Sequence, residues 1–197
     1  MVSDVLHHLN AEMAGVVASV RRSLVQVQNG LAGAGAGTIW HPDGLILTNA
    51  HVAERPSLKV VLPDDRTLPA RILAYDGDLD LAALAVEATG LAAIELGDSR
   101  RLQPGQWVLA LGHPWGVPGA VSAGIVAGVG AHLPKMPLAH REWIAVSLRL
   151  RPGHSGGPLV DAHGRLVGIN TIMAGPDVGL AVPVHVVKAF LREMVRS

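Results

Sequence analysis

A serine stands among glycines in the sequence Arg149-Leu150-Arg151-Pro152-Gly153-His154-Ser155-Gly156-Gly157-Pro158-Leu159-Val160, with a proline on either side and an apolar run after it. A serine hydroxyl is protonated at neutral pH, so it needs a base to take its proton and donors to stabilise the oxyanion that forms. Glycines let the backbone bend sharply, so that N–H groups can point at one position beside the hydroxyl. The segment indicates a nucleophile at Ser155; the alternative is a glycine–proline turn that happens to hold a serine.

Two orders of catalytic partners are compatible with this serine. The residues Gly153-His154-Ser155-Gly156-Gly157 fit the G-x-S-x-G nucleophile elbow of α/β-hydrolases, which carry their acid and histidine after the serine. Only residues 156–197 remain after it, too few for the strands and helices of that fold. Asp161 and His163 lie there, but in an expected hairpin turn. The other order places the partners upstream, as histidine, aspartate and serine.

The chain supplies both upstream partners beside expected strands. His51 follows the apolar run 45–47, and Asp80 begins the apolar run 81–84. Each alone would be an ordinary surface or capping residue, but with the serine they match the roles of base, orienting acid and nucleophile. Asp78 is a rival for the acid, because alternate residues of a strand share a face.

Short strands separated by turn residues predict a barrel or a sandwich. The turn-rich segment 97–105 is the expected boundary between two lobes. An exposed loop is expected over residues 131–142, and a closing helix after Pro183. The expected strands cover residues 24–28, 38–40, 45–48, 58–62, 67–74, 81–86, 107–111, 120–130, 143–150, 159–161 and 166–172.

Six ordered blocks carry a more specific resemblance: Gly35-Ala36-Gly37, Leu47-Thr48-Asn49-Ala50-His51-Val52, Asp80-Leu81-Ala82-Ala83-Leu84, Leu111-Gly112-His113-Pro114-Trp115-Gly116, Pro152-Gly153-His154-Ser155-Gly156-Gly157-Pro158-Leu159 and Val167-Gly168-Ile169-Asn170-Thr171. Together they resemble the trypsin-like protease domain of the HtrA (Deg) family, from about Leu24 to the C-terminus. The resemblance implies an all-β fold of two six-stranded antiparallel β-barrels, with an N-terminal and a C-terminal helix. The expected units are the N-terminal helix (1–22), the first barrel (23–98) and the second barrel with its closing helix (99–197).

The resemblance implies a serine endopeptidase that hydrolyses peptide bonds of unfolded or extended polypeptides through an acyl-enzyme. His51 is the implied general base and Ser155 the nucleophile. Asp80 is the implied acid, because the family places it directly before the apolar run. The backbone N–H groups of Gly153 and Ser155, with that of His154, are the implied oxyanion hole. The alternatives are an esterase, and a peptide-binding or chaperone-like module whose oxyanion loop is inactive.

The sequence departs from the family pattern near the nucleophile. His154 stands where asparagine is usual, and we expect its side chain to face solvent. Ser147 and Arg151 also differ from the residues common before the motif. These departures leave the resting state of the oxyanion loop open.

The specificity pocket of trypsin-like folds is built from the segment six residues before the nucleophile, which here holds Arg149 and Leu150, with Ala181 as a further lining residue. An inward-pointing Arg149 would favour acidic substrate side chains. An outward-pointing one would leave a small aliphatic pocket beside Leu150. The family habit favours the aliphatic pocket.

Composition excludes several classes of function. Lys+Arg and Asp+Glu are both 16, so there is no basic field for nucleic acid. There is no cysteine, which excludes disulfides, thiolate metal sites and a cysteine nucleophile. The ten histidines are scattered without ligand spacing, so we expect neither a metal nor another cofactor. No uncharged apolar stretch reaches the roughly 18 residues of a membrane span.

The N-terminal residues predict a helix that Ser3 or Asp4 caps and that either covers the body or contacts another subunit. They lack the pattern of a signal peptide, which favours a cytoplasmic protein or a leader removed before this numbering begins. The resemblance implies a homo-oligomer, often a trimer held by aromatic residues near the N-terminus. The non-tryptophan aromatics here, Tyr75 and Phe190, lie elsewhere. Family members usually carry a PDZ domain after the protease, so a protease-only form and a fragment are both compatible.

Overall fold

The structure, a computed structural model, describes residues 2–30, 34–54, 57–131 and 141–195. Most of the expected loop over residues 131–142 therefore lies outside the described residues. The elements in chain order are α1 (Val2–Arg21), β1 (Leu24–Gln28), β2 (Ala34–His41), β3 (Leu45–Thr48), β4 (Leu58–Val61), β5 (Thr67–Asp76), β6 (Leu81–Val86), the 3₁₀ turn η1 (Ser99–Arg101), β7 (Trp107–Gly112), the 3₁₀ turn η2 (Pro114–Gly116), β8 (Ala120–Gly130), β9 (Trp143–Val146), β10 (Pro158–Asp161), β11 (Leu166–Gly175), β12 (Val178–Pro183) and α2 (Val184–Met194).

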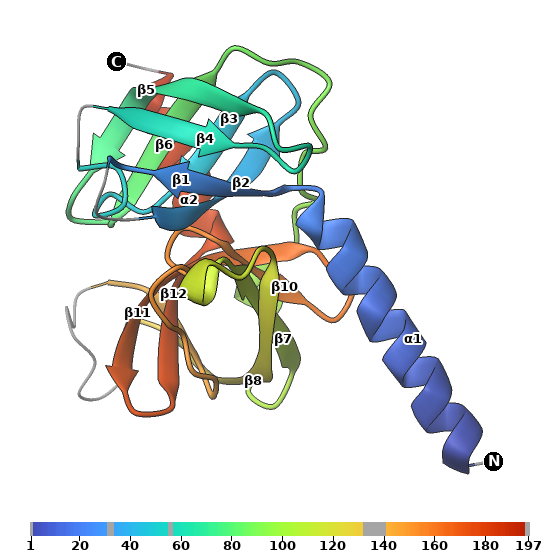
Figure 1. Ribbon diagram of the computed structural model, residues 1–197. Coiled ribbons are helices and arrows are strands. Elements are labelled where there is room, and N and C mark those ends of the chain that lie inside the picture. Colours follow the sequence, from blue (N-terminus) through green and yellow to red (C-terminus); the bar gives the residue numbers. More distant parts are fainter. Residues whose placement is uncertain (1, 31–33, 55–56, 132–140, 196–197) are drawn as a thin grey trace.

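The twelve described strands form two closed antiparallel barrels, one above the other in Figure 1. The first has the order β1-β2-β3-β6-β5-β4, and the second the order β10-β11-β12-β9-β8-β7. This confirms the expected fold of two six-stranded barrels with a helix at each end. Closure pairs every strand on both sides and removes the exposed edges that open sheets carry.

Alternation of side chains places the core inside each barrel. In β4, Leu58 and Val60 are buried while Lys59 between them is exposed, the period of two that a half-buried strand requires. The β2–β3 hairpin turns at Gly44, whose φ is +87°, as expected from the turn residues 41–44. A side chain at Gly44 would also collide with the carbonyl oxygen of Val86.

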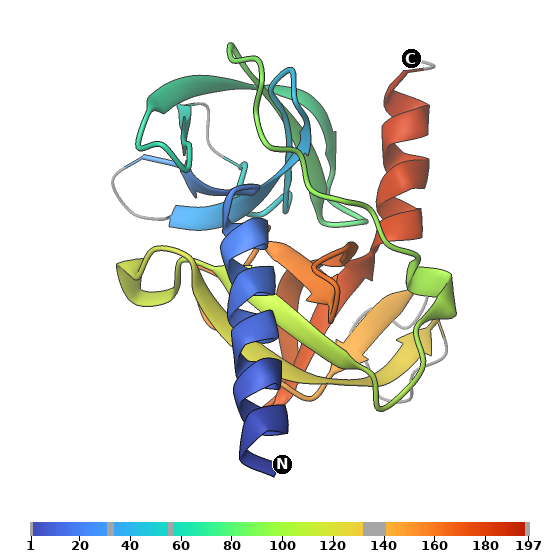
Figure 2. The ribbon, with the colours of Figure 1, turned by 90° about the vertical axis from the view of Figure 1, so that its right-hand side faces the viewer.

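A third apolar cluster joins the two barrels to each other and to both helices. It includes Leu47 and Leu81 from the first barrel, Leu111 and Leu180 from the second, and Phe190 from α2. The helix α2 contacts β5 and β6 of the first barrel and β11 and β12 of the second, and it rises beside the first barrel in Figure 2. Continuous burial across the junction fixes how the barrels sit relative to each other.

The helix α1 packs against the body only through its C-terminal half. Val20 is 3% exposed and belongs to the central cluster, whereas Val5 is 68% exposed. In Figures 1 and 2 the helix runs from the junction of the barrels past the second barrel. It begins at Val2, so the prediction that Ser3 or Asp4 caps it is wrong, because both positions lie inside its first turn. Neither helix of the described segments is long and apolar enough to cross a membrane.

Three strands depart most from the expected ranges, and several others differ by one to three residues. β12 has no counterpart among them, β2 begins four residues earlier than its expected core, and β9 ends at Val146 instead of Leu150. β2 carries alternating glycines because its neighbours approach closely: a Cβ on Gly37 would lie 2.9 Å from a methyl of Val25. The residues after β9 leave the barrel and lead to the nucleophile segment.

Candidate active site

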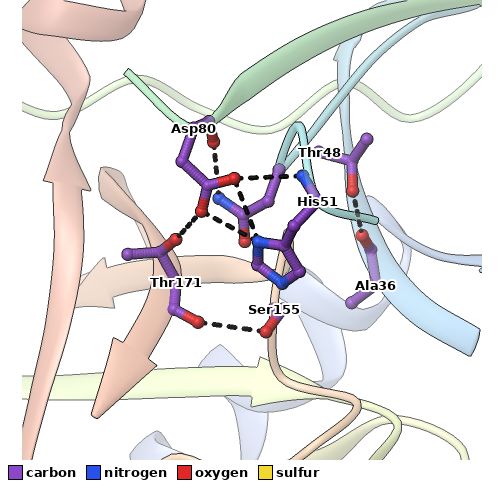
Figure 3. A network of polar contacts seen from close by, with 7 residues as sticks. Ala36, Thr48, His51, Asp80, Ser155 and Thr171 are labelled. Carbon is purple, nitrogen blue, oxygen red and sulfur yellow. Dashed lines mark hydrogen bonds and ion pairs between the residues drawn. The ribbon is translucent and has the colours of Figure 1, made fainter. Parts of the chain in front are cut away.

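His51 lies in the turn that follows β3, and its imidazole is held by Asp80, which directly precedes β6. Nδ1 of His51 lies 2.9 Å from Oδ2 and 3.0 Å from Oδ1 of Asp80 (Figure 3). The backbone N–H of His51 donates to the same carboxylate at 3.1 Å. Asp78, the rival acid, is exposed, and the carboxylate that contacts His51 is that of Asp80.

The carboxylate of Asp80 is further fixed by the second barrel. The hydroxyl of Thr171, in β11, donates to its Oδ2. The side-chain amide of Asn49 donates to the backbone carbonyl of Asp80 at 2.9 Å. Asp80 itself has a φ of +54°, a left-handed conformation that aspartate tolerates better than most residues. These contacts fix both the backbone and the side chain of the residue that orients His51.

Electrostatics favour the charged state of both partners. The hydrogen bond that His51 donates to Asp80 raises the pKa of His51 above its ordinary value of 6.5, against the opposing effect of burial. Burial acts to raise the pKa of Asp80, but the hydrogen bonds from His51 and Thr171 outweigh it and leave that pKa below its ordinary value. Asp80 therefore stays ionised at neutral pH and stabilises a proton on the imidazole.

Ser155 lies in the segment before β10, on the second barrel. Its hydroxyl donates to the backbone carbonyl of Thr171 at 3.0 Å. A hydroxyl has one proton, so in this arrangement that proton is directed to Thr171 and not to His51. Figure 3 shows the imidazole between Asp80 and Ser155, with Nδ1 toward the carboxylate and the other ring nitrogen toward the serine.

A tight turn precedes the nucleophile. The N–H of His154 donates to the carbonyl of Arg151 at 2.9 Å, and Gly153 has a φ of +102°. A proline at the second position and a glycine with positive φ at the third are the signature of a type II turn. The N–H of His154, which the resemblance implied as a further oxyanion donor, is therefore engaged within the turn. The N–H groups of Gly153 and Ser155 donate to no acceptor within the described part of the chain.

The expectation that the His154 side chain faces solvent is wrong. The residue is 1% exposed, and its backbone packs against Gly112, where a Cβ would lie 2.6 Å from the Cα of His154. Its Nδ1 accepts the N–H of Arg151 at 3.2 Å. Burial lowers the pKa of His154; a hydrogen bond with the Arg151 backbone opposes this effect, and the charges of Arg151 and His113 add to it, so the pKa lies below its ordinary value. The ring is therefore neutral at pH 7 and remains an acceptor.

Bonds across the junction attach the nucleophile segment to the first barrel. The N–H of Ala36 in β2 donates to the carbonyl of Ser155 at 2.8 Å. The Thr38 hydroxyl donates to the carbonyl of Gly156 at 3.3 Å. Gly156 has a φ of +84°, and a side chain there would collide with the carbonyl oxygen of Ala36. The serine is thus held by both barrels.

The three expected pocket residues differ in exposure. Leu150 and Ala181 are 6% and 0% exposed, and Leu150 packs on Gly179 of β12, where a Cβ would lie 2.9 Å from its Cγ. The side chain of Arg149 is 56% exposed and lies 4.0 Å from the carboxylate of Asp177. Its Nε also donates to the carbonyl of Pro176 at 3.3 Å. Arg149 therefore points outward.

Sequence reasoning missed Thr171, which contacts both Asp80 and Ser155. The available signal was its position: Asn170 and Thr171 are polar residues inside an otherwise apolar strand, and both are buried. Buried polar side chains are usually hydrogen-bonded to something specific. Asn170 donates to the carbonyl of Pro158 at 2.9 Å. Among the side chains that the structure describes, no group of three forms a candidate metal site.

Comparison with known proteins identifies the family to which the chain belongs. The family model of the trypsin-like peptidase domain matches residues 35–169. HhoB of Synechocystis sp. is 38% identical over 158 residues, which cover 78% of this chain and 38% of that protein. The mitochondrial serine protease HTRA2 of Drosophila grimshawi is 36% identical over 162 residues, which cover 80% of this chain and 38% of HTRA2. The chain thus spans well under half the length of these curated relatives.

Solved structures show the same likeness. The HtrA-type protease AlgW, determined with a tripeptide, matches with a TM-score of 0.86 and 30% identity, over 93% of this chain and 63% of that one. The serine endoprotease from Yersinia pestis matches with a TM-score of 0.82 and 28% identity, over 92% of this chain and 66% of that one. The chain belongs to the trypsin-like peptidase family and is an HtrA-like member of it.

Proposed function

We propose that the chain is a serine endopeptidase that cleaves peptide bonds by a His51–Asp80–Ser155 triad. The observation that carries this proposal is the ion pair of His51 and Asp80. Because Nδ1 is occupied by the carboxylate, the neutral imidazole keeps its lone pair on Nε2, on the side of Ser155. That arrangement has the geometry and tautomer of a general base for a serine nucleophile.

The proposed reaction begins when the Ser155 hydroxyl turns from the carbonyl of Thr171 to Nε2 of His51. As Ser155 attacks the substrate carbonyl carbon, its proton passes to His51, and the charge of the imidazolium is stabilised by Asp80. The oxyanion accepts hydrogen bonds from the N–H groups of Gly153 and Ser155, which are otherwise unengaged. His51 then protonates the leaving amine, and water hydrolyses the acyl-enzyme in a second cycle of the same steps.

The proposed substrates are unfolded or extended polypeptides with a small aliphatic side chain before the scissile bond. The support for an aliphatic preference is that Arg149 points outward while Leu150 and Ala181 are buried and apolar. A peptide library tests this preference. Cleavage after valine, alanine or leucine is expected, and a preference for aspartate or glutamate would contradict it.

Labelling with a fluorophosphonate probe and hydrolysis of an unfolded protein test the activity itself. Ser155→Ala should abolish both, while Ser147→Ala, which removes an exposed hydroxyl from the preceding segment, should change neither. Binding of peptides without labelling or hydrolysis would instead make the chain a peptide-binding module. Turnover of esters without turnover of peptides would make it an esterase.

A further inference from the structure

The turn before the nucleophile decides where one oxyanion donor points. Type I and type II turns differ chiefly in the orientation of the central peptide, which is rotated by about half a revolution between them. The rotation changes ψ of the second residue and φ of the third residue. Here that peptide joins Pro152 to Gly153 and carries the Gly153 N–H. The hydrogen bond from His154 to Arg151 is common to both turn types, so other contacts must select the orientation.

The turn rests on the segment of η2. The N–H of His113 donates to the carbonyl of Gly153 at 2.8 Å. A Cβ on Gly153 would lie 2.6 Å from the carbonyl oxygen of His113 and 2.9 Å from the Cα of Pro114. The backbones are therefore in direct contact at Gly153, the residue whose N–H belongs to the central peptide of the turn.

Trp115 is the next residue of that segment, and its conformation is unusual. Its φ is +55°, which is a genuine outlier for a bulky residue. It is also 71% exposed, so burial of its ring does not hold it there. Strained backbone persists where surrounding contacts over-determine it, often at functional sites. The contact that the structure offers is Arg151, whose guanidinium carbon lies 4.3 Å from the centre of the Trp115 ring.

Arg151 is the first residue of the turn, and it links the inside of the turn to the segment of η2. Its carbonyl accepts from His154 and its N–H donates to the buried imidazole of His154. Its side chain meets Trp115 outside. The buried His154 thus contacts the turn on its inner side, and the cation–π contact between Arg151 and Trp115 lies on its outer side.

We propose that Trp115 and Arg151 are positioning residues that hold the Arg151–His154 turn in the type II orientation, and with it the Gly153 N–H. This inference rests on the proposed hydrolytic function. A cation–π contact at an exposed site is worth about a two- to fivefold change in an equilibrium. Losing it should lower the ratio of competent to incompetent turn orientations by that factor, and the fraction of competent molecules by at most the same factor.

Peptide hydrolysis by Trp115→Ala, Arg151→Ala and the double variant tests the pairing. Each single variant should lower kcat by up to about fivefold with KM unchanged. The double variant should be no slower than the slower single variant, since either change removes the same contact. Trp115→Phe and Arg151→Lys, which keep a ring and a cation, should recover most of the loss. Trp107→Ala and Arg71→Ala remove exposed side chains elsewhere and should have no effect.

A peptide aldehyde gives a readout that a merely structural role would not move. Its adduct with Ser155 places an oxygen where the oxyanion forms, so its inhibition constant should rise by the same factor as kcat falls. Multiplicative losses in the double variant, an unchanged kcat, or a rise in KM alone would overturn the inference. A wild-type chain without Ser155-dependent hydrolysis would overturn the proposed function instead.

Discussion

Asp80 determines how His51 is oriented, through two contacts with its imidazole and one with its backbone N–H. Replacing it with asparagine puts an amide where Nδ1–H needs an acceptor and favours the other tautomer. We expect Asp80→Asn to lower kcat by about 10⁴. Steady-state hydrolysis measures this, with Asp78→Asn as the matched control that should stay within about twofold of wild type. A loss below tenfold in Asp80→Asn would refute the assigned role.

The pH dependence of hydrolysis should report the same pair. His51 must be neutral to take the serine proton, and its pKa lies above the ordinary value of 6.5. The acid limb of kcat/KM, which reports the free enzyme, should therefore have its midpoint above 6.5. In residual Asp80→Asn activity the midpoint should move to lower pH, because the raising hydrogen bond and charge are lost. A midpoint that stays in place would mean that another group controls the limb.

His154 should make the fold sensitive to acid. Its pKa is lowered from 6.5 by burial. Below pH 6.5, His154 therefore binds a proton in the unfolded chain while it is still neutral in the folded chain. Stability therefore falls as pH drops below about 6.5 and continues to fall until the folded pKa is reached. His154→Asn keeps an acceptor for Arg151 and should reduce the decrease in the free energy of unfolding between pH 7 and 5, measured by urea titration. The exposed His163→Asn should leave it unchanged; equal slopes for both variants would disprove the role of burial.

At the scale of elements, α1 has two halves of unequal importance. Val20 lies in the cluster that joins the barrels, while Val5 is 68% exposed. Val20→Ala should lower the free energy of unfolding by about 1–3 kcal/mol, through lost burial and a cavity. Val5→Ala removes the same atoms from the same helix and should stay within about 0.5 kcal/mol. Comparable losses in urea titrations would show that the exposed half is covered in solution.

The elements that sequence predicted well are those with a local signature. The β2–β3 hairpin has its turn residues, and β6 is an uninterrupted apolar run that keeps its expected bounds. β12 has no such signature, because Gly179 and Ala181 are small residues with low strand propensity. Their size is required by the close approach of neighbouring residues. Tertiary contacts also decide the position of Thr171 and the burial of His154. Thr171 contacts Asp80, 91 residues earlier, and His154 packs against Gly112 of β7, so the local sequence carries little information about either.

At the scale of the whole molecule, the junction between barrels tolerates no extra atom beside the nucleophile. Gly156→Ala introduces strain at a φ of +84° and a collision with Ala36. Gly105, with a φ of +91° and nothing within 4 Å of a built Cβ, provides a control that shares only the strain, about 1–2 kcal/mol. We expect Gly156→Ala to cost about 1–3 kcal/mol more than Gly105→Ala and to lose most hydrolysis. Similar stability and activity in the two variants would mean that the junction can open without penalty.

The division of the site between the barrels also has a consequence for synthesis. His51 and Asp80 are translated before Thr171, which holds the Asp80 carboxylate and belongs to β11, 91 residues after Asp80. A ribosome must therefore release nearly all of the second barrel before the nucleophile and its base can meet. Until β11 has been synthesised, the growing polypeptide therefore lacks the residue that holds the Asp80 carboxylate, and the proposed triad is incomplete.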